Sequence, residues 1–349
     1  MNRTFFKAWR NLRYFLFPLS LFYGLAVVIR NLFYEWGIFK VKKLPRPVVS
    51  VGNIMAGGTG KTPMVEWIGR YFSSLGKRVA ILSRGYKRRT KGFVLVTDGV
   101  KIFANPDECG DEPFQMALKS IEEKLGWIVA VCEDRYSAGL KILEKFEVDV
   151  FLLDDGFQRR DLYRDVDIVI ISGDELGEFL IPAGLKREPF SSLKRADVVC
   201  VWGDIGKADK CKRYLDGNKV IANFDYELLE IRKFFDYILS KEEFEGKKII
   251  AFSGIGKHIK FIKLLKDNNF IIEKDFEFPD HYRYNWRDIE KLINILETTK
   301  AEFIITTEKD YARLFNVKEL EKFPFFYARI QVKFLNGEES LKQKLLGLI

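Results

Sequence analysis

A glycine-rich loop near the N-terminus constrains the fold of this chain more than any other stretch. The loop lies within VGNIMAGGTGKTPMVEW, residues 51–67, after a β-branched run at 47–52 and before a stretch that favours a helix. A glycine loop that ends in Gly-Lys-Thr between a strand and a helix is the arrangement of a phosphate-binding P-loop. The stretch therefore predicts an α/β domain that binds a nucleoside triphosphate.

The residues of this loop have chemistry suited to phosphate. Gly57, Gly58 and Gly60 allow backbone N–H groups to approach phosphate oxygens with no Cβ in the way. Lys61 is expected to reach the β- and γ-phosphates of ATP, and Thr62 to bind Mg²⁺. The dipole of the following helix adds attraction for the phosphates.

Two positions set this loop apart from related nucleotide loops. The usual spacing, G-x-x-x-x-G-K-S/T, has glycine where this chain has Met55. This departure weakens the pattern match more than the chemistry, because Gly52 and the later glycines supply flexibility. Membrane-switch ATPases of the deviant Walker type carry a lysine just before the glycine pair, where this chain has Ala56. A membrane-associated ATPase switch is therefore the less favoured alternative.

The strand pattern after the N-terminal region is that of a parallel sheet. Six short apolar runs are rich in β-branched residues and nearly continuous in hydrophobicity, as strands buried on both faces are. Helical stretches separate most of them, so we predict a doubly wound, mostly parallel α/β sheet. The runs cover residues 47–52, 78–83, 127–132, 148–153, 166–171 and 196–202.

The pattern restarts after residue 231, which predicts a second, smaller α/β domain. Apolar runs at 247–256, 269–278 and 301–310 alternate with helical stretches, one of them beginning near Trp286. We expect an N-terminal membrane-interface helical segment, a P-loop domain and a smaller C-terminal domain, whose last strand could return to the P-loop domain. The expected ranges are 1–45, 46–222 and 223–349.

Basic charge is concentrated at the N-terminal end of the chain. Residues 1–46 contain nine Lys or Arg and one acid, which accounts for +8 of the net charge of +9. The rest of the chain is nearly neutral, whereas a nucleic-acid-binding domain would need a basic face on the fold itself. We therefore expect no nucleic-acid partner.

An apolar run at 14–29 lies among these basic residues, interrupted by Pro18 and Gly24. It is shorter than the ~20 residues of a spanning helix. Dense aromatics with flanking Lys and Arg suit an element that lies in the interface of an anionic membrane. The alternative is an apolar helix packed on the body of the protein.

Carboxylates lie at the ends of two predicted elements. Asp154 and Asp155 end a buried strand, and ligands of open parallel sheets bind beyond the carboxyl ends of the strands. They could hold Mg²⁺, or they could simply form a turn with the next glycine. Asp111 and Glu112 precede a probable helix, which they could cap; an acid there could also accept a proton from an attacking hydroxyl.

Other charged and aromatic residues lie at strand ends. Arg135 follows the run at 127–132, and Tyr86 follows the run at 78–83. An arginine in such a position can neutralise phosphoryl charge or pair with a carboxylate. His281, in FPDHYRY, is one of only two histidines, and a lone histidine is more often structural than functional.

Taken together and in order, the motifs closely resemble those of the tetraacyldisaccharide 4′-kinase family, from the N-terminal apolar segment to about residue 314. They are VGNIMAGGTGKTP, SRGYKR, GDEPFQMA, EDRYSAG, LLDDGFQRRDLYRDVDI, IPAGLKREP, FPDHYRY and TTEKDYARL.

The resemblance implies a specific activity. Family members transfer the γ-phosphate of ATP to the 4′-hydroxyl of tetraacyldisaccharide 1-phosphate, which yields lipid IVA in lipid A biosynthesis. They have a P-loop domain, a smaller α/β domain and an apolar N-terminal helix at the inner membrane. By this resemblance we expect a peripheral or monotopic monomer at the cytoplasmic face of the bacterial inner membrane, acting on an acylated disaccharide 1-phosphate.

The resemblance also implies roles for individual residues. Asp111 would be the catalytic base, and His281 of the second domain would pair with it and tune it. Lys61 and Arg135 would also be catalytic. Asp154 and Asp155 would support the metal together with Thr62. The loop residues expected to hold the nucleotide are Met55, Ala56, Gly57, Gly58, Thr59, Gly60, Lys61 and Thr62, and those expected to bind substrate are Tyr86, Glu112, Gln158, Arg187 and Glu188.

Two positions depart from the family pattern. Family members often have histidine where this chain has Arg159, directly after DDGFQ. They often have leucine where this chain has Lys186, and an added cation there could help to hold an anionic substrate.

Overall fold

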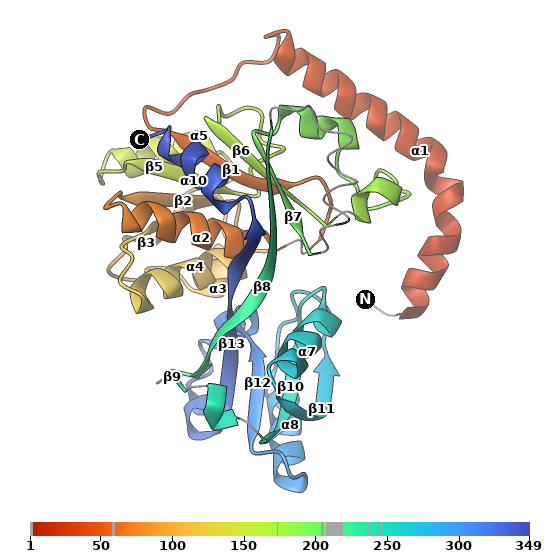
Figure 1. Ribbon diagram of the computed structural model, residues 1–349, viewed down its shortest axis with the longest axis vertical. Helices are drawn as coiled ribbons and strands as arrows, with labels where there is room; N and C mark the ends of the chain where they lie inside the picture. Colours follow the sequence, from red (N-terminus) through yellow and green to blue (C-terminus); the bar gives the residue numbers. More distant parts are fainter. Residues whose placement is uncertain are drawn as a thin grey trace. The chain divides into compact units, whose positions relative to one another are not determined.

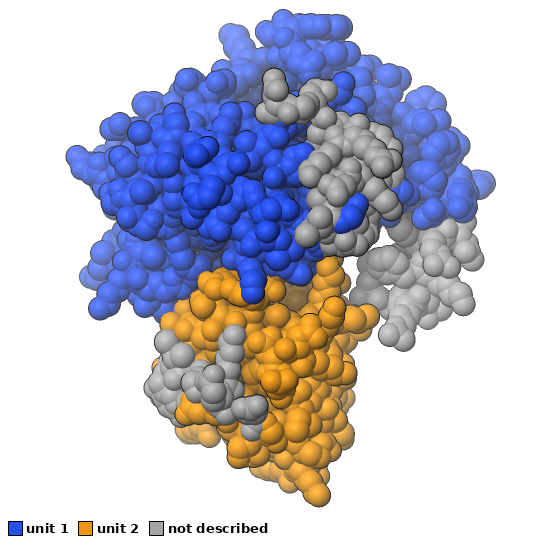
Figure 2. Space-filling model, in the orientation of Figure 1, with its two compact units in different colours: residues 1–225, 332–349 blue, residues 226–331 orange. Residues whose placement is uncertain are grey.

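The chain forms two compact units. The computed structural model describes residues 3–349 apart from 58–59, 173, 204–205, 207–218, 236–237, 240 and 245. The first unit contains residues 1–225 and 332–349, and the second contains residues 226–331 (Figure 2). The division at 225 lies near the expected boundary at 222, and the C-terminal residues belong to the first unit.

The first unit contains a mostly parallel sheet with strand order β8-β7-β6-β1-β5-β2-β4-β3 (Figure 1). All pairs are parallel except β3 with β4. Each of the six predicted runs is a strand of this sheet, so the predicted doubly wound fold is confirmed. The strands are β1 Val48–Asn53, β2 Val79–Ser83, β3 Val94–Thr97, β4 Ile128–Val131, β5 Val150–Asp154, β6 Val166–Ile171, β7 Val198–Trp202 and β8 Val220–Lys233.

Helices join these strands and cover the sheet. Ala138 and Ile142 of the fifth helix, for example, pack against Leu82 of β2 and Phe151 of β5 in one buried cluster. Burial of each large aliphatic or aromatic side chain of this kind contributes about 1.5–3 kcal/mol. Among the described residues, the helices of this unit are α1 Arg3–Glu35, α2 Lys61–Ser74, α3 Pro106–Cys109, α4 Asp111–Glu122, α5 Arg135–Leu143 and α10 Glu338–Leu346, with 3₁₀ turns η1 Asp174–Gly177 and η2 Phe190–Arg195.

Helix α1 is longer than the apolar run suggested. It continues through both Pro18 and Gly24. Its residues Arg13–Glu35 are long and apolar enough to cross a membrane. This judgement rests on length and composition alone, and among the described residues only this helix meets it. Ser20 and Asn31 are buried against the rest of the unit, whereas Phe15 is 83% exposed. One side of α1 therefore packs on the body of the protein, which was the alternative to membrane contact in the sequence analysis. The other side is apolar and exposed to solvent.

The strands of the second unit continue the same strand order as β11-β10-β12-β13-β8, in which β10 pairs in parallel with β11 and β12, and β12 pairs in parallel with β13. The predicted runs form β10, β11 and β12, and a helix begins at Trp286 as expected. Strands β8 and β13 begin in one unit and end in the other. The elements are β9 Ile238–Leu239, η3 Lys241–Phe244, β10 Lys248–Ser253, α7 His258–Asp267, β11 Ile271–Glu277, α8 Trp286–Thr298, β12 Phe303–Thr307, α9 Glu308–Leu314, η4 Lys318–Lys322 and β13 Phe325–Asn336.

Candidate active site

The glycine loop connects the end of β1 to the start of α2. Gly57 has φ +105° and Gly60 has φ +75°, and both values lie in the region that glycine adopts without a steric cost. Gly60 directly precedes the first residue of α2, Lys61. Gly58 and Thr59, two predicted nucleotide-binding residues, lie outside the described residues. The local backbone explains why glycine is needed at 57 and 60.

The absence of glycine at position 55 has a structural explanation. Met55 forms an antiparallel bridge with Lys186, and the next amide, of Ala56, donates to the carbonyl oxygen of Leu185 at 2.7 Å. The Arg187 amide donates to the carbonyl oxygen of Ile54, also at 2.7 Å. This short pairing holds the entry to the loop in ordinary extended backbone, so no left-handed residue is required there.

Asp155 lies between two cations directly after β5. It accepts two hydrogen bonds from the Arg187 guanidinium, both at 2.9 Å, and its Oδ1 is 3.4 Å from the Lys61 ammonium. Burial raises the pKa of Asp155, but Lys61 and Arg187 outweigh it and hold that pKa far below its ordinary value. Asp155 is therefore a fixed anion that positions the P-loop lysine.

Asp154 is buried, and only one of its two carboxylate oxygens is hydrogen-bonded within the protein. Its Oδ2 accepts a hydrogen bond from Ser83 Oγ at 3.1 Å, while Oδ1 has no hydrogen-bond partner in the protein. Burial raises the pKa of Asp154, the Glu112 carboxylate raises it further, and the Lys61 ammonium opposes both. An open carboxylate oxygen beside a phosphate loop fits a cation ligand, because a buried acceptor without a partner is costly.

No group of three or more His, Cys, Asp or Glu is arranged to enclose a metal ion in the described part of the chain. Mg²⁺ is usually bound through one or two carboxylates together with substrate phosphates and water. Thr62, the second residue of α2, and Asp154, the last residue of β5, are the predicted donors of that kind, and their role stays a prediction.

Asp111 and Glu112 form the first turn of α4, whose N-cap position is occupied by Gly110 with no side-chain cap hydrogen bond, so neither acid is the cap that one sequence interpretation expected. Gly110 precedes them with φ +93°, and a Cβ on it would lie 3.1 Å from the Tyr86 carbonyl oxygen. The loop that carries Tyr86 is thus packed against the start of α4. Tyr86 itself is 58% exposed, and the Lys87 ammonium lies 5.7 Å from the centre of its ring.

A buried ion pair that sequence reasoning missed links α4 to α2. The Glu66 carboxylate of α2 accepts hydrogen bonds from the Lys119 ammonium at 2.5 Å and from the Gln115 amide at 3.0 Å, both on α4. Glu66 and Lys119 are 1% and 0% exposed. The pair connects the helix behind the phosphate loop to the helix that begins at Asp111. An acid facing inward from an amphipathic helix was the available sequence signal.

Cations collect at the carboxyl ends of three neighbouring strands. Arg135 follows β4, Arg84 follows β2 and Arg159 follows β5, and the strand order is β5-β2-β4. Arg135 is buried, donates to the carbonyl oxygens of Cys132 and Glu133, and has no hydrogen-bond partner for its Nε. Burial, with Arg159 and Arg84 nearby, lowers the pKa of Arg135 to about 10. Such a cluster is suited to an anion.

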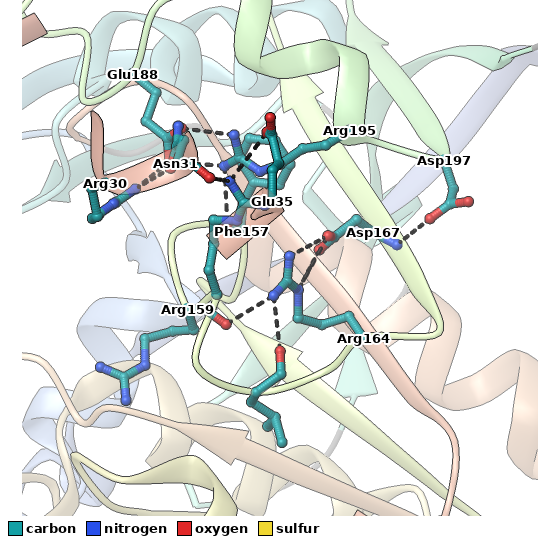
Figure 3. A network of polar contacts seen from close by, with 12 residues as sticks. Arg30, Asn31, Glu35, Phe157, Arg159, Arg164, Asp167, Glu188, Arg195 and Asp197 are labelled. Atoms are coloured by element: carbon teal, nitrogen blue, oxygen red, sulfur yellow. Dashed lines mark hydrogen bonds and ion pairs between the residues drawn. The ribbon is translucent and has the colours of Figure 1, made fainter. Parts of the chain in front are cut away.

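Glu188 and Gln158, two predicted substrate-binding residues, contact the protein itself. Glu188 is fully buried between Arg30 and Asn31 of α1 and Arg195 of η2 (Figure 3). Burial raises the pKa of Glu188, but the two arginines and Asn31 bring it below the ordinary value. The Gln158 amide donates to the Asn53 carbonyl oxygen at 2.8 Å. Their contact with a substrate stays a prediction.

His281 lies in a turn of the second unit. It has φ +60°, and its amide donates to the carbonyl oxygen of Gly254 at 3.1 Å. The side chain of Lys309 approaches His281 Nε2 at 3.4 Å. The Gly254 amide donates in turn to the buried carboxylate of Asp310, which also binds Tyr284 and Arg313. This network holds the turn, whereas the pairing of His281 with Asp111 stays a prediction.

Comparisons with known proteins agree on one family. A family model described as tetraacyldisaccharide-1-P 4′-kinase matches residues 12–349. The tetraacyldisaccharide 4′-kinase of Aquifex aeolicus (strain VF5) is 35% identical over 335 residues, which cover 95% of this chain and 98% of that protein. That of Chlorobium limicola is 38% identical over 347 residues, covering 95% and 97%. A crystal structure of LpxK from Aquifex aeolicus in complex with ATP matches with a TM-score of 0.80 at 34% identity, covering 97% of this chain and 99% of that one.

Proposed function

Because this chain belongs to the tetraacyldisaccharide-1-P 4′-kinase family, we propose that it transfers the γ-phosphate of ATP to the 4′-hydroxyl of tetraacyldisaccharide 1-phosphate. It is a kinase of lipid A biosynthesis. The proposed mechanism is supported chiefly by one observation. Asp155 makes ion pairs with both Lys61 and Arg187 at the end of the glycine loop.

The first unit supplies the groups that hold the donor. Backbone amides of the glycine loop and the Lys61 ammonium bind the β- and γ-phosphates. Arg135, whose buried Nε has no hydrogen-bond partner in the protein, is proposed to neutralise charge on the transferring group. Thr62 and Asp154 would hold Mg²⁺, with Asp155 supporting them, and the ion would neutralise charge between the β- and γ-phosphates.

Asp111 is the proposed base. Its carboxylate accepts the proton of the 4′-hydroxyl as that oxygen attacks the γ-phosphorus, and the bond from phosphorus to the bridging oxygen of ADP breaks. The N-terminus of α4 stabilises the ionised carboxylate. Because the transition state of phosphoryl transfer is loose, a weak base in the correct position suffices. His281 is proposed to orient this carboxylate, and Glu112 and Tyr86 to contact the sugar.

Transfer of labelled phosphate tests the proposed acceptor directly. ATP labelled in the γ-phosphate is incubated with the protein and purified tetraacyldisaccharide 1-phosphate in detergent micelles. Label at the 4′ position of the lipid is expected. Release of free phosphate with no labelled lipid would instead support the ATPase switch, against which Ala56 in place of the signature lysine already counts.

The open side of α1 is proposed to lie in an anionic membrane surface at the cytoplasmic face of the inner membrane, where a monomer would meet its acylated acceptor. Phe15, Phe22 and Leu25 are 83%, 72% and 58% exposed on this helix. Basic residues flank the apolar stretch, and each adds about 1 kcal/mol of attraction to an anionic surface.

Two substitutions on this side test the membrane contact. Phe15→Ser together with Phe22→Ser should lower binding to vesicles that contain anionic lipid by about 10-fold or more, because two large apolar side chains lose their burial. Co-sedimentation with vesicles measures it. Ile259→Ser, which removes an apolar side chain of the second unit that is 72% exposed, is the matched control. Equal vesicle binding by the parent protein, the Phe15→Ser, Phe22→Ser protein and the Ile259→Ser protein would refute the membrane contact.

A further inference from the structure

We propose that α1 is a positioning element of the kinase site as well as a membrane element, through Ser20, Tyr23 and Asn31 on its packed side. These side chains hold the segment 179–188, which carries Arg187 to Asp155 and supports the entry of the glycine loop. The inference rests on the proposed function, because it assigns α1 a role in the kinase site. Its central measurement, the affinity for ATP, needs no lipid acceptor.

The first link runs from the middle of α1 to residues 180–187. Ser20 is 3% exposed. Its hydroxyl donates to the Leu180 carbonyl oxygen at 2.8 Å and accepts from the Ala183 amide at 3.0 Å. The Tyr23 hydroxyl donates to the Arg187 carbonyl oxygen at 2.9 Å. The helix thus makes hydrogen bonds to the backbone of the segment at three points.

Gly24 permits this close packing. A Cβ at Gly24 would lie 2.8 Å from Leu180 Cδ1, a distance that forces the side chain to move. Phe179, next to Leu180, packs edge-on against Tyr14 and Phe17. The segment is therefore pressed against α1 by apolar contacts as well as by hydrogen bonds.

The second link is the buried carboxylate of Glu188. Asn31 Nδ2 donates to Glu188 Oε2 at 3.1 Å, and Arg30 lies 3.3 Å from Oε1 (Figure 3). Arg195 lies 2.8 Å from Oε2. Because a buried carboxylate is costly when its partners are removed, α1 is part of what keeps Glu188, and hence the neighbouring Arg187, in place.

The third link runs from the segment to the site. The Arg187 guanidinium binds both oxygens of Asp155 at 2.9 Å and donates from Nε to the Met55 carbonyl oxygen at 3.1 Å. The pairing of residues 54–56 with 185–187 continues the same contact to the loop backbone. Displacement of α1 would therefore shift Arg187 and Asp155, and with them the position of the Lys61 ammonium that pairs with Asp155.

The two tasks of α1 lie on different sides of one helix. Ser20, Val27 and Asn31 recur at the spacing of one helical face and are buried, whereas Phe15 and Phe22 are seven residues apart on another face and exposed. Substitutions can therefore separate positioning from membrane binding.

The test compares two double variants of the full-length protein. Tyr23→Phe with Asn31→Ala should weaken ATP binding, measured by calorimetry without acceptor, by about 10-fold, because two hydrogen bonds to the segment are lost. KM for ATP should rise in step, while vesicle binding stays unchanged. Phe15→Ser with Phe22→Ser should show the reverse: weakened vesicle binding and unchanged ATP affinity.

The outcomes separate this inference from the proposed function. ATP affinity equal to that of the parent in the Tyr23→Phe, Asn31→Ala protein would overturn the positioning role and leave the kinase function untouched. Absence of lipid phosphorylation by the parent protein would overturn the acceptor and leave the ATP result readable. If thermal melting shows that the double variant is unfolded, the single variant Tyr23→Phe, which removes only one oxygen atom, is measured in its place. A lower ATP affinity of this single variant supports the inference, and an unchanged ATP affinity overturns it.

Discussion

Asp111→Asn is expected to lower kcat for phosphoryl transfer by about 10²–10⁴-fold, the range that general base catalysis contributes. The amide keeps the shape of the carboxylate at the start of α4 but cannot accept the proton of the attacking hydroxyl. The affinity for ATP should change little, because the glycine loop and Lys61 hold the donor. Steady-state kinetics with labelled ATP, together with calorimetric ATP binding, separate the two quantities.

Asp107→Asn is the matched control for this experiment. Asp107 lies on α3, directly before α4, and its side chain is half exposed in an ion pair with Arg89. Its substitution should leave kcat within about 2-fold, as is usual for a surface position. Near-normal turnover by the Asp111→Asn protein would remove Asp111 from the role of base.

Glu66→Ala is expected to destabilise the protein by about 3–5 kcal/mol, because it removes the carboxylate that Lys119 and Gln115 share in the interior. Denaturant or thermal unfolding of the first unit measures the change. Activity of the surviving folded protein should also fall, since this pair joins α2, behind the phosphate loop, to α4, which begins at Asp111.

The same two helices carry a second ion pair that serves as the control. Arg70 of α2 makes two hydrogen bonds of 2.7 Å to Glu123, the residue that follows α4, with both side chains partly exposed. Glu123→Ala should cost only about 0–1 kcal/mol. Replacing the buried pair by Glu66→Leu with Lys119→Met should recover most of the loss. Equal costs for Glu66→Ala and Glu123→Ala would show that burial does not govern the pair.

The fold was predictable wherever its signal was local. Strands buried on both faces read as continuous β-branched runs, and all six that were predicted in the first unit are present. Strand β3, Val94–Thr97, was missed because it is a short antiparallel edge strand outside the alternation of strand and helix. The apolar run that Pro18 interrupts in the sequence lies within one continuous helix, α1. A proline inside a helix costs about 3 kcal/mol, and the packing of Phe17 and Ser20 against residues 179–183 offsets it.

The sequence by itself determined the phosphate loop, the acids at the end of β5 and at the start of α4, and the sheet that brings strand ends together. Each depends on residues that are close along the chain, where backbone geometry and hydrophobic period leave few choices. Only the tertiary structure decided that Arg187 clamps Asp155, that Glu66 meets Lys119, and that α1 has one face for the segment 179–188 and one left open. These contacts join residues from 32 to more than 150 positions apart. Their partners are selected by packing in three dimensions, and no local pattern in the chain encodes that choice.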